Sequence, residues 1–252
     1  MLSILIGSAQ QLSQNMFITS HGHSDVGFVR DNNEDSFVVD ENKGIFAVAD
    51  GVGGLPYGAL ASRLAVRFFG SLVNGADSCT TGAEFREIAH VVHQNIVECG
   101  SLVSGENGIG TTFSGLRITD GKLLYAHVGD SSIFLKNGQG LNKISKCHTL
   151  GDELIDKHGP EAARDMPEHY MHTLTRCMGQ DIDFEVDLGE RELSPGDIYL
   201  VCSDGVTNMV EMPEIEKMME GMEPEPLVHA LVDLANQNGG TDNSTVVCLK
   251  VS

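Results

Sequence analysis

The sequence predicts an α+β fold in which antiparallel sheets are covered by helices. Strand-like segments come in runs instead of alternating strictly with helices, which argues against a doubly wound parallel sheet. Apolar runs end three times at an Asp beside a Gly, within 45–51, 124–130 and 198–205, and Asp242 opens the last run. Carboxylates gathered at such strand ends repel one another unless they hold a hard divalent cation. The sequence therefore predicts a metal-dependent enzyme.

The individual elements follow from hydrophobic periodicity. Short apolar runs, several of them rich in Val and Ile, predict strands at 36–40, 44–49, 111–118, 122–128, 131–136, 184–189, 197–202 and 245–251. Apolar residues at spacings of three and four predict helices at 57–73 and 83–101. Pro213 at the start and Gly221 near the end predict a helix at 213–220, and a further helix is expected at 225–237. The polar segment 147–175 contains several Gly and Pro residues, and we expect it to form a mobile flap with a short helix near 151–158.

Length and composition bound the organisation of the chain. Of 252 residues, 41% are hydrophobic, which is enough for a substantial core. Residues 1–16 form a polar leader, and 17–252 contain no linker and no repeat, so we expect a single domain. The sequence has no run of 18 or more apolar residues, so we expect no membrane span. Six Cys scattered without paired spacing favour reduced thiols and a cytoplasmic protein.

The charge of the chain is strongly acidic. Asp and Glu number 36 against 16 Lys and Arg, which gives a net charge of −20. Nucleic acids and anionic membranes require a basic surface, so the balance argues against both kinds of partner. Most of these carboxylates serve solubility, and a metal site needs only a handful of them.

Seven short motifs then occur in a fixed order across residues 20–252. They are Ser24-Asp25-x-Gly27-x-x-Arg30-x-x-Asn33-Glu34-Asp35, Asp50-Gly51-x-Gly53-Gly54, Gly110-Thr111-Thr112, Gly129-Asp130-Ser131, Leu174-Thr175-Arg176-x-x-Gly179, Ser203-Asp204-Gly205 and Gly240-Thr241-Asp242-Asn243-Ser244-Thr245. Each is weak alone, but the ordered set resembles the metal-dependent protein phosphatase family, the type 2C Ser/Thr phosphatases of bacterial type. The resemblance implies a four-layer α-β-β-α sandwich, two antiparallel sheets flanked by helices, with the metal cleft at one edge.

The resemblance also implies a set of metal ligands. Asp50 would bridge two Mn²⁺ or Mg²⁺ ions, and the carbonyl of Gly51 would bind one of them. Asp204 and Asp242 would complete the protein ligands of the other ion. Asp130, together with Asp204, would form a weaker third metal site. Both metals prefer oxygen ligands, so the sequence does not choose between them.

The implied reaction is hydrolysis of phosphoserine and phosphothreonine monoesters on proteins. A hydroxide bridging the two ions would attack phosphorus directly, since paired cations lower the pKa of a shared water. Glu34 and Asp35 would hold metal-bound waters. Arg30 would bind the substrate phosphate, because its planar fork matches two phosphoryl oxygens as Lys does not. The expected partners are phosphorylated proteins and a cognate Ser/Thr kinase, and the enzyme is expected to be a monomer.

Three positions depart from the family pattern. Val52 stands where many eukaryotic members have a His that is proposed as a general acid, which indicates the bacterial type. Ser132 replaces the Arg that usually follows Gly-Asp-Ser. Cys147 replaces the Asp of a later Asp-His-Ser/Thr motif.

Other residues have simpler interpretations than a reactive site. His21 and His23 could form a metal pair, but we expect them to be edge-strand side chains. Cys147 beside His148 could suggest a thiol nucleophile and its base, although neighbours in sequence rarely face each other. A stripe of five methionines is expected in helix packing, with partner docking as the alternative; they are Met209, Met212, Met218, Met219 and Met222.

Two other functions compete with the protein phosphatase. A catalytically silent relative that binds a signalling partner should have lost metal ligands, yet Asp50, Asp204 and Asp242 are all present. Another two-metal hydrolase, a nuclease or a small-molecule phosphatase, is the second alternative. The acidic surface argues against the nuclease, while a small-molecule substrate stays open.

Overall fold

Two five-stranded antiparallel sheets form the centre of the molecule. The computed structural model describes residues 16–73, 78–180 and 184–252. The first sheet has, in spatial order, β1 (Ile18–Asp25), β10 (Ser244–Val251), β9 (Ile198–Cys202), β6 (Ser132–Asn137) and β7 (Gly140–Lys143). The second has β2 (Asp35–Asp40), β3 (Ile45–Asp50), β4 (Phe113–Thr119), β5 (Lys122–Val128) and β8 (Asp187–Glu192). Within these ranges all neighbouring strands of the two sheets pair antiparallel.

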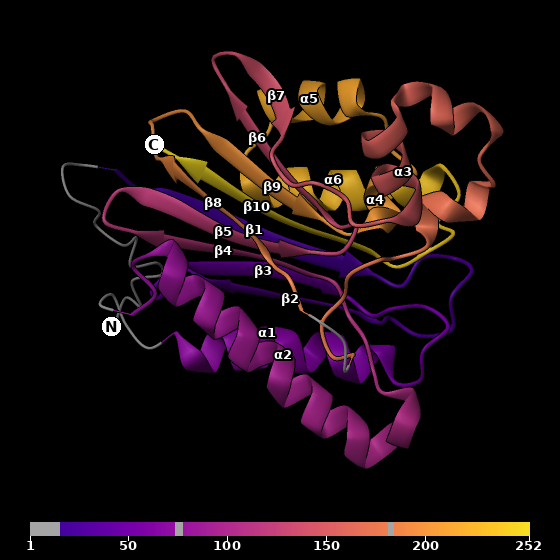
Figure 1. Cartoon of the computed structure of the whole chain (residues 1–252). Helices are drawn as coiled ribbons and strands as arrows, with labels where there is room; N and C mark the ends of the chain where they lie inside the picture. The colour runs from indigo at the N-terminus through magenta and orange to yellow at the C-terminus, as the bar shows by residue number, and fades with distance from the viewer. Residues whose placement is uncertain (1–15, 74–77, 181–183) are drawn as a thin grey trace, which may run out of the picture.

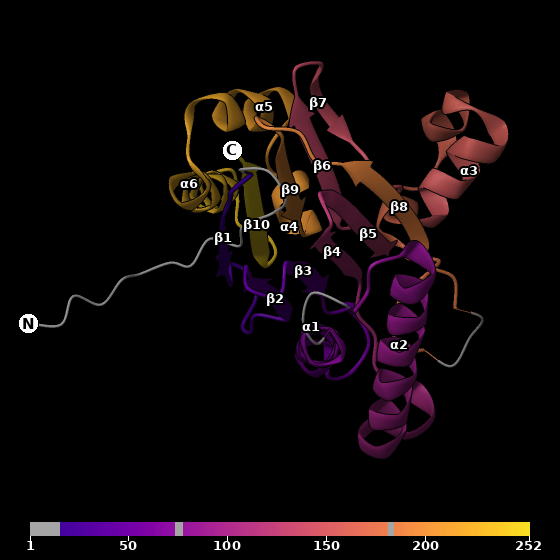
Figure 2. The ribbon, with the colours of Figure 1, turned by 90° about the vertical axis from the view of Figure 1, so that its left-hand side faces the viewer.

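Helices cover the outer face of each sheet, and the result is four layers (Figures 1 and 2). α1 (Gly58–Leu72) and α2 (Gly82–Ser104) lie against the second sheet, whereas α5 (Met212–Gly221) and α6 (Pro224–Gln237) lie against the first. The expected α-β-β-α sandwich is therefore confirmed. The short α4 (Asp204–Thr207) follows β9, and a single 3-10 turn, Gly105–Asn107, follows α2.

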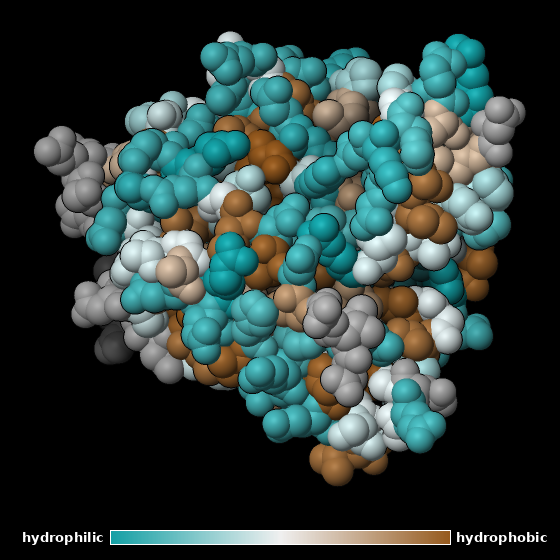
Figure 3. Space-filling view, viewed as in Figure 1, coloured by the Kyte–Doolittle hydropathy of each residue, from teal (hydrophilic) through white to brown (hydrophobic). Residues whose placement is uncertain are grey.

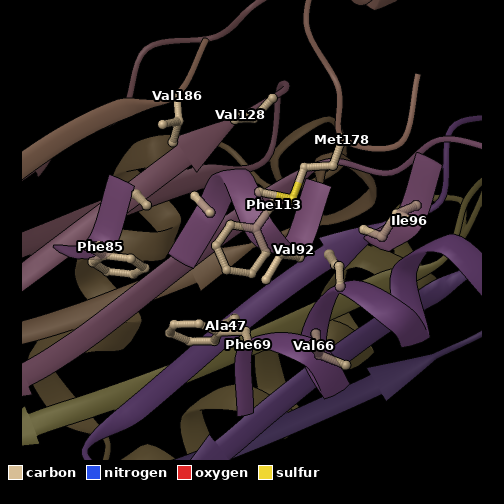
Figure 4. Packing of buried hydrophobic residues seen from close by; sticks show 14 of the residues in the cluster. Ala47, Val66, Phe69, Phe85, Val92, Ile96, Phe113, Val128, Met178 and Val186 are labelled. Atoms are coloured by element: carbon tan, nitrogen blue, oxygen red, sulfur yellow. The ribbon is translucent and has the colours of Figure 1, made fainter. Parts of the chain in front are cut away.

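The hydrophobic core has three layers that match this architecture. One cluster fills the space between α1, α2 and the second sheet, one lies between the sheets, and one lies under α5 and α6. In the first cluster the ring of Phe69 stacks on Phe85 at 5.4 Å and meets the ring of Phe113 edge-on at 5.3 Å (Figure 4). Burial of this apolar area is the main force that holds the layers together.

Most expected elements are present, with two strands that the sequence patterns did not predict. β1 is polar and lies at an edge of its sheet, and β7 has four residues, so neither shows apolar alternation. β8 starts at Asp187 and not at 184. The expected edge location of His21 and His23 is confirmed by β1, where the ring of His23 lies 4.0 Å from that of His229.

The segment 147–175 forms compact helical turns outside the four layers. It contains α3 (Leu150–His158), close to the expected short helix, and the 3-10 turns Pro160–Asp165 and Glu168–His172. The mobility expected for it stays a prediction. The expected leader lies outside the described residues except for Met16, which packs against the core between the sheets.

The hydrophilic surface and the free cysteines agree with the acidic composition and the reduced thiols expected from the sequence. Hydrophilic residues cover much of the face seen in Figure 3, with smaller hydrophobic areas between them. All six Cys are free thiols. Among the helices of the described residues, none combines the length and hydropathy needed to cross a membrane.

Candidate active site

A cleft of about 1300 Å³ opens at one edge of the sandwich. Seven of the eight site residues expected from the sequence line this cleft. These seven are Arg30, Glu34, Asp50, Gly51, Asp130, Asp204 and Asp242. The exception is Asp35, which is buried. Segments far apart in the sequence thus meet in one place.

Strand ends deliver the carboxylates to this edge. Asp50 is the last residue of β3, and its antiparallel partner is Asp35, the first residue of β2. Asp204 follows β9 after one residue and begins α4, while Asp242 precedes β10, the antiparallel neighbour of β9. Asp130 lies just after β5. Because neighbouring strands run in opposite directions, the end of one strand and the start of the next share an edge.

The backbone around Asp50 is held by two threonines. Thr111 Oγ1 donates a hydrogen bond to the carbonyl of Asp50 at 2.8 Å, and the Asp50 amide donates to Thr112 Oγ1 at 3.0 Å. A Cβ on Gly51 would lie 2.6 Å from the backbone carbonyl carbon of Gly58, so only glycine fits here. Gly110-Thr111-Thr112 is one of the seven motifs, but the sequence alone assigned it no role. In the structure its two threonines hold the backbone of Asp50 in place through these hydrogen bonds.

Asp35 is buried behind the cleft, and two hydroxyl groups donate hydrogen bonds to one of its carboxylate oxygens. Its Oδ2 accepts from Ser203 Oγ at 2.7 Å and from Thr245 Oγ1 at 2.6 Å, while Oδ1 has no hydrogen-bond partner among the described residues. Burial raises the pKa of this carboxyl to about 7, and the charge of Asp204 adds to the rise. Ser203 and Thr245 were missed as individual contributors, because only the fold shows that both hydroxyls face one carboxylate.

Burial, and next to it mutual repulsion, raises the pKa values of the carboxylates in the cleft. Burial raises the pKa of Asp50 well above its usual range, and the charges of Asp35 and Asp204 raise it further. The pKa of Asp204 is raised by burial and by Asp242, and that of Asp130 rises to about 7 through burial and Asp204. Several carboxylates that each disfavour ionisation of the others form a strong site for a cation.

The donor set fits hydrated divalent ions of the Mg²⁺ or Mn²⁺ kind. It consists of carboxylates and the Gly51 carbonyl, the oxygen ligands that hard cations prefer. Within the described ranges, no group of three or more His, Cys, Asp or Glu side chains is arranged to hold a metal ion unaided. Mg²⁺ keeps several waters and needs only one or two carboxylates, so this arrangement agrees with hydrated ions bound by few direct protein ligands.

Arg30 lies at the cleft but contacts a carboxylate. Its Nη2 donates to Asp242 Oδ2 at 2.7 Å, and both side chains are partly exposed. The sequence placed Arg30 on the substrate phosphate and Asp242 on a metal, and it did not foresee that the two would pair. The pair neutralises one negative charge at the cleft, and as an exposed ion pair it adds little to stability.

The three departures from the family pattern leave the acidic cluster intact. Val52 lines the cleft and its amide donates to the carbonyl of Gly110 at 2.9 Å. Ser132 is buried in β6. Lys143 Nζ lies 2.9 Å from Cys147 Sγ, and the pKa of this thiol is raised by burial.

Cys147 and His148 do not form a nucleophile and base. His148 Nδ1 accepts from the amide of Gly129 at 3.1 Å, so its proton is on Nε2, which donates to Asp187 at 3.2 Å. Of the methionines, Met209, Met218 and Met219 pack in the cluster under α5 and α6, as expected, whereas Met212 and Met222 are exposed.

Comparison with known proteins identifies the family. The model of the family described as Protein phosphatase 2C matches residues 21–236. The chain belongs to the protein phosphatase 2C family. Protein phosphatase PhpP of Streptococcus pneumoniae is 35% identical over 241 residues, which cover 91% of this chain and 96% of that protein.

Solved structures of this family share the fold. The Mycobacterium tuberculosis serine/threonine phosphatase PstP/Ppp matches with a TM-score of 0.83 and 30% identity over 92% of this chain and 98% of that one. The catalytic domain of PstP in complex with two manganese ions matches with a TM-score of 0.81 and 28% identity over 94% and 99%. The family, the fold and the enzyme class expected from the sequence, a protein phosphatase, are confirmed.

The acidic cluster predicts a stability that depends on both pH and metal. In the metal-free protein the raised pKa values of Asp35 and Asp130 mean that the folded state binds protons more tightly than the unfolded state. Their contribution to stability is therefore complete below about pH 4 and is lost as the pH rises to about 7. Divalent ions replace these protons, so the gain in melting temperature on adding Mn²⁺ should be larger at about pH 8 than at about pH 5.

Melting curves with EDTA and with MnCl₂ at both pH values would measure this effect. At an ion concentration about 100 times the Kd, the gain should approach about 2.7 kcal/mol, or about 5–11 °C for a chain of this size. In EDTA, Asp130→Asn should flatten the pH dependence, because it removes one of the titrating carboxyls. A gain in melting temperature that is equal at both pH values would contradict the prediction.

Proposed function

We propose that this phosphatase hydrolyses phosphoserine and phosphothreonine monoesters in proteins, with two divalent ions, Mn²⁺ or Mg²⁺, in the cleft. The observation that carries the proposal is the convergence of four strand-end aspartates, with raised pKa values for Asp50, Asp130 and Asp204, in one open cleft. The two manganese ions in the related PstP catalytic domain support the same number of ions here.

Each acidic residue has a proposed place around the ions. Asp50, held by Thr111 and Thr112, would bridge the two ions, and the Gly51 carbonyl would bind one of them. Asp204 and Asp242 would bind the other. Asp130 would contribute a weaker third site with Asp204, since its carboxyl lines the same cleft.

In this proposal the protein residues position water and the substrate phosphate, and the metal ions lower the pKa of bound water. When bound, the two ions would supply a water of lowered pKa and would offset charge on the phosphoryl oxygens. Glu34, which lines the cleft, and Asp35 behind it would orient water by accepting its protons in hydrogen bonds. Arg30 would leave Asp242 for the substrate phosphate, where its fork can contact two oxygens.

The openness of the cleft favours protein substrates over a small enclosed ligand. The cleft has polar walls with several carboxylates, and the helical turns of 147–175 border it through Glu168 and His172. We propose phosphorylated proteins as substrates and a Ser/Thr kinase as the enzyme that produces them. We also propose a monomeric enzyme in the cytoplasm, and the six free thiols agree with that compartment.

Release of phosphate from a phosphothreonine peptide tests the proposal. The purified protein should release phosphate with MnCl₂, and EDTA should abolish the release. A panel of free phosphorylated metabolites run beside the peptide distinguishes a small-molecule phosphatase. A folded, metal-saturated protein that releases phosphate from neither group would refute the proposal and favour the silent, partner-binding relative.

A further inference from the structure

We propose that an apolar shelf beside the cleft binds a hydrophobic side chain of the substrate, close to the phosphorylated residue. The shelf consists of Phe28, Val29 and Met209 around the Gly239–Gly240 turn. This inference rests on the proposed function, because it assigns a substrate class to the same cleft: phosphoproteins with an apolar residue near the phosphate.

Phe28 and Val29 are among the most exposed large apolar residues of the described part of the chain. Phe28 is 73% exposed and Val29 is 66% exposed, in a chain whose net charge is −20. A single exposed apolar side chain needs no explanation. Here two successive ones occupy the turn between β1 and β2, and the next residue is Arg30.

The shelf is continuous with the cleft and not an isolated patch. Val29 and Met209 both line the cleft together with Arg30. The ring of Phe28 lies over Gly240, where an added Cβ would be 2.9 Å from Cδ2 of the ring, and the sulfur of Met209 would lie 3.5 Å from a Cβ on Gly239. Because Gly239 and Gly240 have no side chains, the backbone surface between Phe28 and Met209 is open.

The turn that carries Phe28 is held firmly. The Phe28 amide donates to the Gly240 carbonyl at 2.7 Å, and Asn243 Nδ2 donates to the Val26 carbonyl at 2.9 Å. Gly27 has a φ of +77°, and a Cβ there would lie 2.5 Å from the Asp242 carbonyl oxygen, so the tight approach requires glycine. A preorganised apolar surface loses little entropy when a ligand binds, which is the property of a recognition site.

The distance from the phosphate site limits which substrate residue can reach the shelf. Consecutive residues of an extended peptide are separated by about 3.3–3.6 Å. Phe28 and Val29 immediately precede Arg30, the proposed phosphate ligand. We therefore expect the shelf to contact a side chain one to three residues from the phosphorylated position.

The cleft charge makes this contact selective. Asp31 and Glu168 also line the cleft and have no proposed metal role. They disfavour acidic substrate residues nearby by like-charge repulsion. We therefore expect the order Leu, then Ser, then Asp when the flanking residue of one phosphothreonine peptide is varied.

The experiment compares kcat/KM for these peptides with that for capped single-residue phosphothreonine, which has no flanking side chain. For Phe28→Ser, kcat/KM on the Leu peptide should fall about tenfold, mainly through KM, as for other small apolar contacts in specificity pockets. Phe28→Leu should restore most of the preference. Leu102→Ser, which removes an 86% exposed side chain from α2 away from the cleft, is the matched control.

The outcomes separate the two levels of the proposal. Loss of the Leu preference with unchanged hydrolysis of capped phosphothreonine supports the shelf. An unchanged preference in Phe28→Ser, or an equal loss on all substrates, overturns it while the phosphatase activity stands. A wild-type protein that hydrolyses none of the phosphorylated substrates would instead overturn the proposed function itself.

Discussion

Asp204→Asn is expected to lower Mn²⁺-dependent hydrolysis of a phosphothreonine peptide by at least about 100-fold. Loss of residues that merely orient metal ligands costs about 10–100-fold, and Asp204 is a proposed direct ligand that lines the cleft. Its carboxylate is also the group whose charge raises the pKa values of Asp35, Asp50 and Asp130. Initial rates over a range of MnCl₂ concentrations would measure both the loss and any weaker metal activation.

Stability provides an independent readout for the same variant. Asp204 is one of several crowded carboxylates, so its neutral replacement should leave the metal-free protein at least as stable as the wild type. The increase in melting temperature with Mn²⁺ should shrink. Asp233→Asn, the same change at an exposed position of α6, is the control and should alter neither property. Full activity with a normal metal response in Asp204→Asn would refute its role as a ligand.

Arg30→Lys is expected to lower kcat/KM on phosphopeptides by about 10- to 100-fold, although it keeps the positive charge. Hydrogen bonds to charged groups contribute about 1.5–3 kcal/mol, and Lys cannot offer the planar two-point contact that Arg offers to a phosphate. Much of the loss should appear in KM, because the contact is already made to the ground-state phosphate.

Folding should be almost unaffected by this change. The pair between Arg30 and Asp242 is partly exposed, and such pairs contribute about 0–1 kcal/mol. Arg63→Lys, at an exposed position of α1, is the matched control for the substitution itself. An Arg30→Lys enzyme with wild-type KM and kcat would show that the guanidinium belongs to Asp242 alone and does not bind substrate.

The helices and buried strands could be predicted because their signals are local. α1 and α6 repeat apolar residues on one face. β3 is a short apolar run that ends at Asp50, and β9 is one that Asp204 follows after a single residue. β1 could not be predicted in this way, because it is a polar edge strand whose eight residues pair with β10 more than two hundred positions later. Such a strand is specified by its partner more than by its own composition.

In the candidate site, too, local motifs could be predicted from the sequence and long-range contacts could not. The ordered motifs were sufficient to select Arg30, Glu34, Asp50, Gly51, Asp130, Asp204 and Asp242, and the structure places all of them along one cleft. The burial of Asp35 between the hydroxyls of Ser203 and Thr245 could not be predicted, nor could the contact between Arg30 and Asp242. These contacts join residues between about 168 and 212 positions apart in the chain, and no local pattern records them.

The sequence by itself thus determined the family, the layered α+β architecture and the residue types available for a divalent metal, because motif order and periodicity are properties of the chain. The tertiary structure alone decided which carboxylates are buried, which repel one another, and which apolar side chains border the cleft. Burial and repulsion depend on distances through space, and these distances exist only after the two sheets have brought their strand ends to a common edge.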